Sequence, residues 1–219
     1  MQPSHPKKHH SDSLITILIL NLYTMEINLL AILDGVRPIS FELKTHIPRI
    51  LKHKVLKHGS RLLEAGMIND KIWFVQKGLL RGFTEHEGVD VTAWFRVEGE
   101  FAVSIPSFYD QIPSTEHIEA FEDTDVLYIT YQELDFIYEN YLEFNYHGRK
   151  LLTPYFVEAD RQRAALKKMS GEARFDWLVQ NKPFLLNRVP DKYLASYCGI
   201  TPETYSKIKK ERLYRGKLY

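Results

Sequence analysis

Short hydrophobic runs in the middle of the chain predict β-strands. Between residues 56 and 129, apolar or alternating runs rich in β-branched and aromatic residues are separated by six glycines. Such runs suit a half-buried pleated surface, and glycine supplies the backbone angles that tight turns need. The expected strands lie near residues 72–75, 79–83, 91–95, 117–121 and 126–129. Short strands at this spacing predict a β-sandwich or barrel.

Helical patterns flank this strand-rich region. Residues 26–53 carry apolar positions at helical spacing with breaks at Pro38 and Pro48, so one or two short helices are expected there. After Thr130 the period lengthens towards 3.6 residues. Leu152 lies in this region, and one stripe with spacings of four, four, three, four and three residues consists of Leu151, Tyr155, Ala159, Gln162, Leu166 and Met169.

A long helix with one apolar stripe can be covered in two ways. Either it pairs with the same helix of a second chain, giving a homodimer, or it packs on the strand-rich region. Pro154 interrupts the pattern, because proline lacks a backbone donor and clashes with the preceding turn. The helix is therefore expected to kink there, or to restart with Thr153 as its cap and Pro154 in its first turn.

Residues 192–213 have the pattern of a helix-turn-helix. Gly199 permits the tight turn, and Thr201 followed by Pro202 is a strong signal for the start of a second helix. The small, glycine and apolar positions that fit the motif are Leu194, Ala195, Cys198, Gly199, Ile200, Tyr205 and Ile208. The alternative is an ordinary corner between two helices in a domain with another role.

The charge of the chain is unevenly distributed. The whole sequence carries 29 Lys and Arg against 28 Asp and Glu, a net charge of +1. Residues 187–219 hold eight basic and three acidic side chains, a net of +5, and residues 1–186 have a net charge of −4. A basic patch on a mildly acidic body is typical of DNA-binding proteins, because phosphates supply most of the non-specific affinity.

The second helix of the motif carries candidate DNA-binding residues on the side away from Tyr205 and Ile208. Glu203, Thr204 and Lys207 are expected to face the major groove, where a carboxylate can accept from cytosine and an ammonium can donate to guanine. Phosphate contacts position a protein without reading sequence. They are expected from the remaining polar and basic residues, Ser206, Lys209, Lys210 and Arg212. Thr201, which begins the helix, completes the predicted DNA-binding set.

A glycine-punctuated β-roll, a long dimerising helix and this helix-turn-helix together resemble the Crp/Fnr family of bacterial transcription regulators, over roughly residues 26–213. The stretch RVPDKYLASYCGITPETYSKIKK is similar to the Bacteroidetes-type members. By this resemblance Glu203 and Lys207 fall where the family reads bases. Pro202 stands where the catabolite activator has a base-reading arginine, so that protein's DNA site is not carried over. Only RGKLY follows the helix, which implies a truncated wing.

The resemblance also implies a ligand pocket, and here the sequence departs from the family. Residues 98–120 align with the phosphate-binding cassette of the cyclic-nucleotide-binding members. Val103, Ser104 and Ser114 replace the family's glycine, ribose-binding glutamate and phosphate-binding arginine, and Thr115 keeps a hydroxyl. A buried phosphate without a paired cation is costly, so cyclic AMP is not expected to bind. The pocket then holds another effector or is filled by its own side chains, Phe101, Phe108 and Tyr109.

Several functional classes are disfavoured by what the sequence holds. The single cysteine, Cys198, excludes a disulfide or a cysteine-ligated cluster within one chain and suits a reducing cytoplasm. Its place in the helix crossing disfavours a nucleophilic role. The spacing of His46, His53 and His58, seven and five residues, does not predict a metal site. No nucleotide-binding or hydrolase motif occurs, so we expect no enzyme and no cofactor.

The first residues are expected to lie outside the fold. A basic start is followed by an apolar run over residues 14–22, which is about half the roughly 20 residues needed to span a bilayer. Residues 1–24 are interpreted as a tail or as sequence before a true start at Met25, with an export signal as the less favoured alternative.

The sequence thus predicts an α+β chain in four parts. They are the tail at 1–24, a jelly-roll-like, cyclic-nucleotide-binding-like β-roll at 25–130, connecting and dimerisation helices at 131–169, and the helix-turn-helix domain at 170–219. The expected function is a cytoplasmic, homodimeric transcription regulator that binds a pseudo-palindromic double-stranded DNA operator and is not gated by cyclic AMP. RNA polymerase and an unidentified small molecule are further candidate partners, and no membrane is expected. The alternatives are a ligand-binding β-roll protein whose helix-turn-helix no longer reads DNA and, third, an enzyme of the double-stranded β-helix class.

Overall fold

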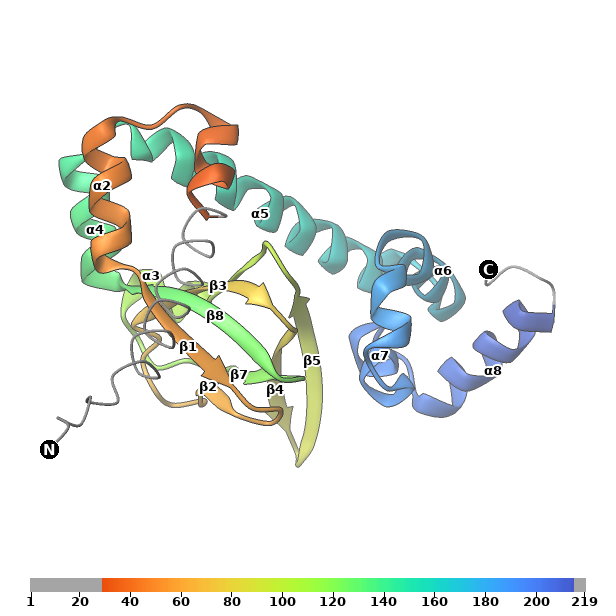
Figure 1. Cartoon of the computed structure of the whole chain (residues 1–219). Coiled ribbons are helices and arrows are strands. Elements are labelled where there is room, and N and C mark those ends of the chain that lie inside the picture. Colours follow the sequence, from red (N-terminus) through yellow and green to blue (C-terminus); the bar gives the residue numbers. More distant parts are fainter. Residues whose placement is uncertain (1–28, 215–219) are drawn as a thin grey trace, which may run out of the picture.

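Two antiparallel sheets form the centre of the protein (Figure 1). The computed structural model describes residues 29–214; the expectations about residues 1–24 and about the truncated wing lie outside this range. The first sheet has the order β1-β8-β3-β6, formed by Lys52–Leu56, Thr124–Thr130, Lys71–Lys77 and Phe101–Ala102. The second has the order β2-β7-β4-β5, formed by Arg61–Leu63, His117–Ala120, Leu80–His86 and Val89–Arg96. The five predicted strands are confirmed as β3, β4, β5, β7 and β8.

Sequence reasoning missed the three strands β1, β2 and β6. β1 reads KHKVL and pairs with β8 alone, so most of its side chains are exposed and it shows no apolar alternation. β2 and β6 have only three and two residues, which is too short for a pattern. β3 was easier to predict because both of its faces are covered: Trp73 and Val75 belong to one buried cluster, and Phe74 belongs to another.

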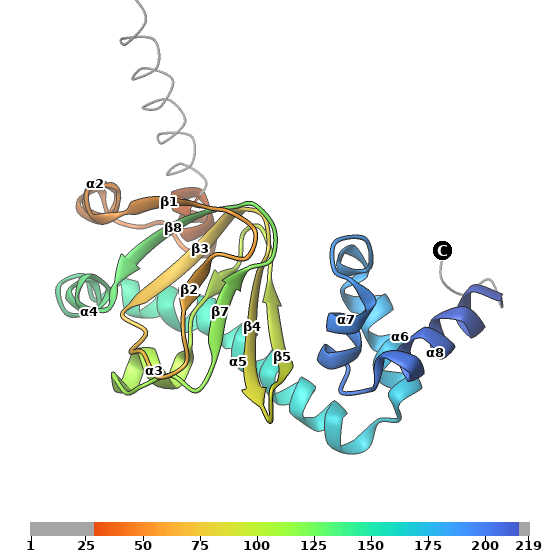
Figure 2. The same ribbon diagram turned by 90° about the horizontal axis from the view of Figure 1, so that it is seen from below.

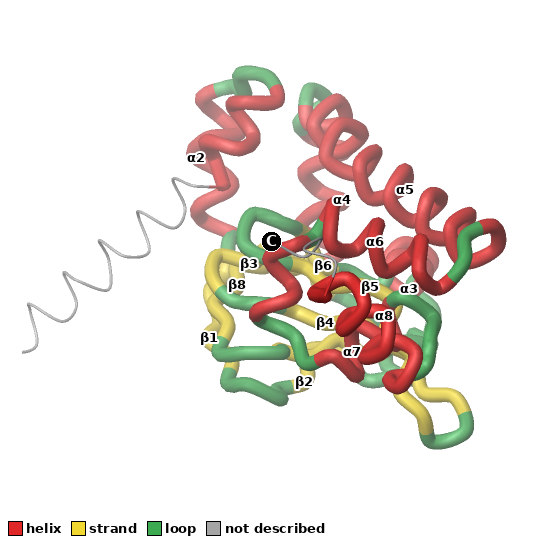
Figure 3. Tube along the Cα trace, turned by 90° about the vertical axis from the view of Figure 1, so that its right-hand side faces the viewer, coloured by secondary structure: helices red, strands yellow, loops and turns green. Residues whose placement is uncertain are grey.

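Helices cover the outer face of the first sheet (Figure 3). They are the helical residues 29–36, α2 (Phe41–Ile50), α3 (Ile105–Asp110), α4 (Tyr131–Asn140) and the start of α5 (Phe144–Lys168). Ser40 caps α2, and Thr130 with Glu133 forms a capping box at the start of α4. The break expected at Pro38 is confirmed, but the one at Pro48 is wrong: Pro48 lies inside α2, where it removes only the one hydrogen bond to the Lys44 carbonyl, and the helix continues to Ile50.

α5 runs without interruption for 25 residues, so the kink or restart expected at Pro154 is wrong. Proline removes the hydrogen bond to the Lys150 carbonyl, and both residues are exposed, so water can satisfy that carbonyl. Thr153 does not cap a helix; its hydroxyl donates to the Arg149 carbonyl at 2.6 Å.

The predicted stripe of α5 is covered by the β-roll over only part of its length. Tyr155 and Gln162 face the β-roll: the Tyr155 hydroxyl accepts from the Phe101 amide at 2.7 Å, and the Gln162 amide donates to the Ala93 carbonyl at 3.0 Å. Leu166, from the same stripe, is 47% exposed. The β-roll therefore covers one part of α5, and exposed apolar side chains are left on the rest of the helix.

The C-terminal helices pack on one end of the β-roll (Figure 2). They are α6 (Gly171–Asn181), the 3-10 turn η1 (Pro183–Asn187), α7 (Asp191–Tyr197) and α8 (Pro202–Tyr214). One buried cluster joins Phe95 and Phe121 of the β-roll to Tyr197 and Leu194 of α7. The whole chain is thus a mixed α+β fold, as the sequence predicted, with α7 lying between β5 and α8.

Candidate nucleic-acid interface

The turn between α7 and α8 has the geometry that the sequence pattern predicted. Gly199 adopts the left-handed backbone conformation, with φ of +63°, which glycine tolerates best. The Ile200 amide then donates to the Ala195 carbonyl at 3.0 Å and closes the turn. Ala195 is fully buried, so the two helices approach closely where it lies.

The start of α8 is capped as predicted. The Thr201 hydroxyl accepts from the Thr204 amide at 3.2 Å, and Pro202 is the first helical residue. Glu203 follows in the first turn, where its own backbone amide and the Thr201 hydroxyl lower the pKa of its carboxyl. Glu203 is therefore an anion at neutral pH, held beside free helix amides.

α8 has one buried face and one exposed face. Tyr205 and Ile208 are 0% and 4% exposed, and the Tyr205 ring packs edge-on against Phe175 of α6 at a centroid distance of 5.0 Å. The opposite face presents its side chains to solvent: Glu203, Thr204, Ser206, Lys207 and Lys210. Five of the eight predicted DNA-binding residues therefore lie together on one exposed surface, which we call the α8 surface.

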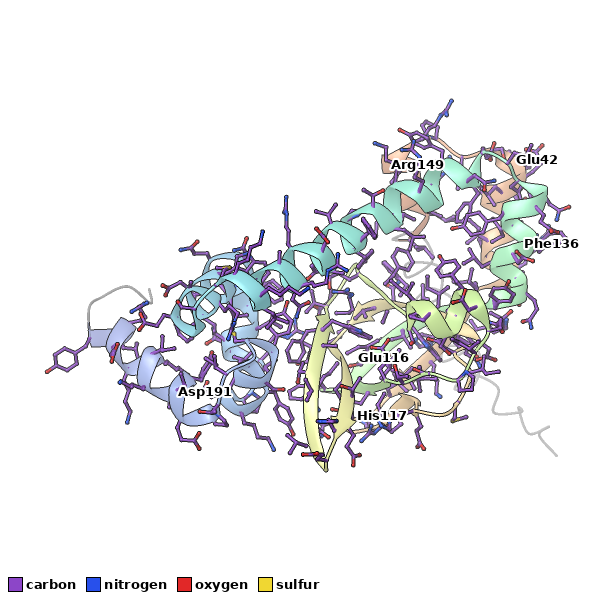
Figure 4. All side chains as sticks on the ribbon, turned by 180° about the vertical axis from the view of Figure 1, so that it is seen from behind. Glu42, Glu116, His117, Phe136, Arg149 and Asp191 are labelled. Atoms are coloured by element: carbon purple, nitrogen blue, oxygen red, sulfur yellow. The ribbon has the colours of Figure 1, made fainter. Side chains whose placement is uncertain are left out.

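Two residues that were predicted to contact phosphates form ion pairs with carboxylates of this domain instead. Arg212 is only 9% exposed, and its guanidinium donates to both carboxylate oxygens of Asp176 at 2.8 and 2.9 Å and to Glu172 at 3.2 Å. The Lys209 ammonium donates to Asp191, at the start of α7 (Figure 4), at 2.8 Å. We therefore withdraw Arg212 from the DNA-binding set. The charge of Lys209 is neutralised by Asp191 in this structure.

Arg174 of α6 holds the turn in place, and sequence reasoning missed it. Its guanidinium donates to the carbonyls of Leu166, Met169 and Gly199 at 3.3, 3.1 and 3.0 Å. The end of α5 and the turn of the helix-turn-helix are thereby tied to one side chain. No signal in the sequence around Arg174 distinguishes it from a surface arginine.

α7 is also fixed to the β-roll by polar contacts. The Thr92 amide donates to the Ser196 hydroxyl at 2.9 Å, and that hydroxyl donates to the Asp90 carbonyl at 3.2 Å. Arg188, which the charge count placed in the basic patch, binds Glu98 at 2.9 Å and also Glu122. The orientation of α8 is thus set by a docked domain.

The residues of the aligned cassette do not surround an anion site. Ser104 and Ser114 are buried, and their hydroxyls lie 3.1 Å apart as each other's partners. Thr115 is exposed and Val103 is half-buried. The neighbouring Glu116 (Figure 4) accepts from the Trp94 indole at 3.0 Å, and burial raises the pKa of its carboxyl.

The aromatic residues expected to fill the cassette pocket lie elsewhere. Phe101 and Phe108 belong to the cluster between the first sheet and the helices, and Tyr109 lines a partly open space on that same side. The expectation that they plug the pocket is therefore corrected, because Phe101 and Phe108 pack in the core beneath α4 and α5, and Tyr109 is 37% exposed.

Among residues 29–214, no group of three His, Cys, Asp or Glu side chains could hold a metal ion. Within the same range, no helix has the length and apolar character of a membrane span. Cys198 is buried in the helix crossing, and burial raises the pKa of its thiol to about 12.

Neither a protein-family model nor a curated protein sequence matches the chain. Several solved structures are similar to the chain. FixK2 from Bradyrhizobium japonicum is 14% identical, with a TM-score of 0.65 over 76% of this chain and 86% of that one. A protein described as a Crp/Fnr-family transcriptional regulator from Eubacterium rectale is 17% identical, with a TM-score of 0.65 over 81% and 85%. A cyclic nucleotide-binding domain from Methylobacillus flagellatus is 16% identical, with a TM-score of 0.56 over 67% and 86%. The chain thus has the fold of Crp/Fnr-type regulators.

Proposed function

We propose that this protein is a cytoplasmic, sequence-specific DNA-binding transcription regulator. The observation that carries the proposal is the α8 surface: polar and basic side chains project from a helix whose other face is buried in a helix-turn-helix. An α-helix of this kind fits the major groove of B-form DNA. The shared fold with Crp/Fnr-type regulators supports the same role.

The residues of the α8 surface have two proposed roles, base reading and phosphate binding. Glu203 accepts from a cytosine amino group, and Lys207, one turn later, donates to guanine; Thr204 lies between them. Ser206 and Lys210 contact phosphates, and Thr201 acts mainly through its cap. Each base contact discriminates by about 1–3 kcal/mol.

The exposed side of α5 supports a homodimer. Phe156, Ala159, Arg163 and Leu166 are exposed and follow one another at spacings of three, four and three residues, which is the spacing of a coiled-coil seam. Phe156 is 74% exposed and Leu166 is 47% exposed in the single chain. Pairing along this seam would bury them and place two α8 helices in successive major grooves, about 34 Å apart, on a pseudo-palindromic site.

Binding-site selection on random DNA tests the proposed function. The wild-type protein should select a pseudo-palindrome, and part of its binding should survive a rise in salt because base contacts are less salt-dependent than phosphate contacts. Glu203→Ala should change the selected sequence. Lys210→Ala should select the wild-type sequence and bind all DNA more weakly. Failure of the wild-type protein to select any sequence would favour the rival function, a ligand-binding protein that does not read DNA.

Sedimentation measurements test the dimer separately. Phe156→Glu places a charge in the seam and should shift the protein to monomers. Phe136→Glu on α4 (Figure 4) is the matched control, since Phe136 is 47% exposed and lies on a different helix. Equal association of the two variants would contradict the seam.

We also propose that cyclic AMP does not gate this protein. The support is chemical: Ser104 and Ser114 are uncharged and bound to each other, the neighbouring Glu116 carries a carboxyl, and Arg96, the cation near Glu116, is bound to Glu158. A phosphate there would lack the arginine that makes such sites tight. Calorimetry with cyclic AMP should show no binding, and micromolar or tighter affinity would overturn the proposal.

A further inference from the structure

A partly open space lies between the first sheet and the helices that cover it. Its volume is ≈ 80 Å³. Its wall includes strand residues and residues of α4 and α5, among them Phe74, Leu127, Leu134, Ile137, Leu151 and Tyr155. The space is on the opposite face of this sheet from the cluster between the two sheets. It is therefore distinct from the place where Ser104 and Ser114 bind each other, although Phe101 and Tyr109 of the aligned segment line it.

The wall of this space is almost wholly apolar. Protein interiors are normally close-packed, and an apolar void does not hold water because water finds no hydrogen-bond partners there. Dry voids lined by leucine, isoleucine and phenylalanine bind small hydrocarbons such as benzene in other proteins. The chemistry of the wall therefore selects an uncharged, apolar occupant.

Tyrosine hydroxyls are the polar feature of this otherwise apolar space. Tyr109 and Tyr138 both line it, and burial raises the pKa of both hydroxyls. The Tyr138 hydroxyl lies over Gly148 of α5, where an added Cβ would come within 2.2 Å of its oxygen. Glycine weakens a helix interior, so its use here marks a position where the tyrosine ring needs the room. Hydroxyl groups can both donate and accept, so the pair can hydrogen-bond a polar atom of an occupant.

We propose that this space binds a small uncharged molecule with an apolar body and one hydrogen-bonding atom directed at the Tyr138 hydroxyl. Its role as the effector of DNA binding rests on the function proposed above; its existence as a binding site does not.

The wall of the space is connected to the C-terminal domain by a series of contacts. The Tyr155 hydroxyl accepts from the Phe101 amide at 2.7 Å, and the Arg96 guanidinium lies over the Tyr155 ring at 4.7 Å. Arg96 and Lys182 both bind the Glu158 carboxylate, at 3.1 and 2.6 Å. An occupant that displaces Tyr155 therefore acts on the side chains that hold α5 to β5 and to the residue before η1.

Indole is a suitable probe because it has two fused rings and a single N–H donor. Calorimetry and protein-detected NMR of the full chain without DNA should show saturable binding of one indole per chain. Leu134→Phe fills the space and should weaken binding at least tenfold. Val55→Phe adds a ring on β1 at a side chain that is 63% exposed, and it should bind indole like the wild type.

A second filling variant, Ile72→Phe on β3, decides the result if Leu134→Phe does not fold by circular dichroism. Absence of saturable binding to the wild type, or undiminished binding to the folded filling variants, would overturn the site. The two proposals fail separately. A chain that binds indole but selects no DNA sequence keeps the site and loses the proposed function, and a chain that selects DNA but does not bind indole does the reverse.

Discussion

Gly199, in the turn of the helix-turn-helix, lies directly against Leu166, near the end of α5. A Cβ added to Gly199 would come within 2.8 Å of the Leu166 Cδ2 atom. Arg174 reinforces the contact by donating to the carbonyls of both residues. The position of the turn is therefore fixed by the same helix that carries the proposed dimer seam.

Gly199→Ala should lower the free energy of unfolding by about 1–3 kcal/mol, because alanine resists a φ of +63° and its Cβ would collide with Leu166. Denaturant unfolding measures the change. In a Leu166→Ala background the collision is removed and only the backbone strain is left, so the penalty should shrink. Gly35→Ala is the control, since Gly35 is helical and no atom lies within 4 Å of its added Cβ. An equal penalty in both backgrounds would rule out the collision with Leu166.

Arg212 and Lys210 should separate stability from DNA affinity. Arg212→Ala removes the guanidinium that binds the carboxylates of Asp176 and Glu172 and should lower stability by about 1–3 kcal/mol. Lys210→Ala should leave stability unchanged, because Lys210 is exposed, and should weaken DNA binding and reduce its salt dependence. Thermal unfolding and DNA titration at two salt concentrations measure the two effects. If folded Arg212→Ala showed the salt-dependent loss and Lys210→Ala did not, Arg212 would return to the DNA-binding set.

Cys198 should resist alkylation in the folded protein. Burial raises the pKa of its thiol to about 12, so almost no thiolate is present at pH 8. Iodoacetamide should label the folded chain at least about 10³-fold more slowly than the denatured chain, whose thiol has an ordinary pKa. Mass spectrometry counts one label per chain at most, because Cys198 is the single cysteine. Equally fast labelling of folded and denatured protein would show that the helix crossing is open.

The Glu158 contacts should be sensitive to acid. Burial acts to raise the pKa of Glu158, but Arg96 and Lys182 outweigh it and hold the pKa below its ordinary value of 4.5. A carboxyl with a lower pKa in the folded state stabilises the protein above the pKa of the unfolded state, and this contribution is lost as the pH falls through the folded value.

Glu158→Gln should therefore be less stable than the wild type by about 1–3 kcal/mol at pH 7, and the difference should diminish below about pH 4.5. Denaturant unfolding across this range measures it. Glu139→Gln changes an exposed carboxyl of α4 and should show no comparable difference. If the difference in the free energy of unfolding between Glu158→Gln and the wild type stays constant down to pH 3, the ionised carboxylate is not its cause.

Local sequence rules predicted the helix-turn-helix well, because the features that define it are local. Gly199, the Thr201 cap and the buried pair Tyr205 and Ile208 are set by backbone angles and by helical spacing within a few residues. The same rules could not assign Arg212. Its partner Asp176 is 36 residues away in the sequence, and a basic helix end gives no sign of which carboxylate it meets.

Two other features could not be predicted from the local sequence, because they depend on solvent exposure and on contacts with distant residues. The restart expected at Pro154 assumed that a lost helix hydrogen bond must end the helix, but the exposed carbonyl of Lys150 can bind water. The docking of α7 on β5 involves Ser196 and Thr92, which are 104 residues apart. Contacts over that distance leave no periodicity in the sequence, so the orientation of α8 could not be predicted.

The cluster shared by the β-roll and the helix-turn-helix determines how the chain must respond to temperature. Phe95 and Phe121 pack against Tyr197 and Tyr193, at ring-centroid distances of 5.6 and 4.9 Å. Any movement that carries α7 away from β5 exposes this aromatic surface to water, and hydration of apolar surface raises the heat capacity. Separation of the two parts should therefore have a calorimetric signature, and we expect the two parts to melt as one cooperative unit.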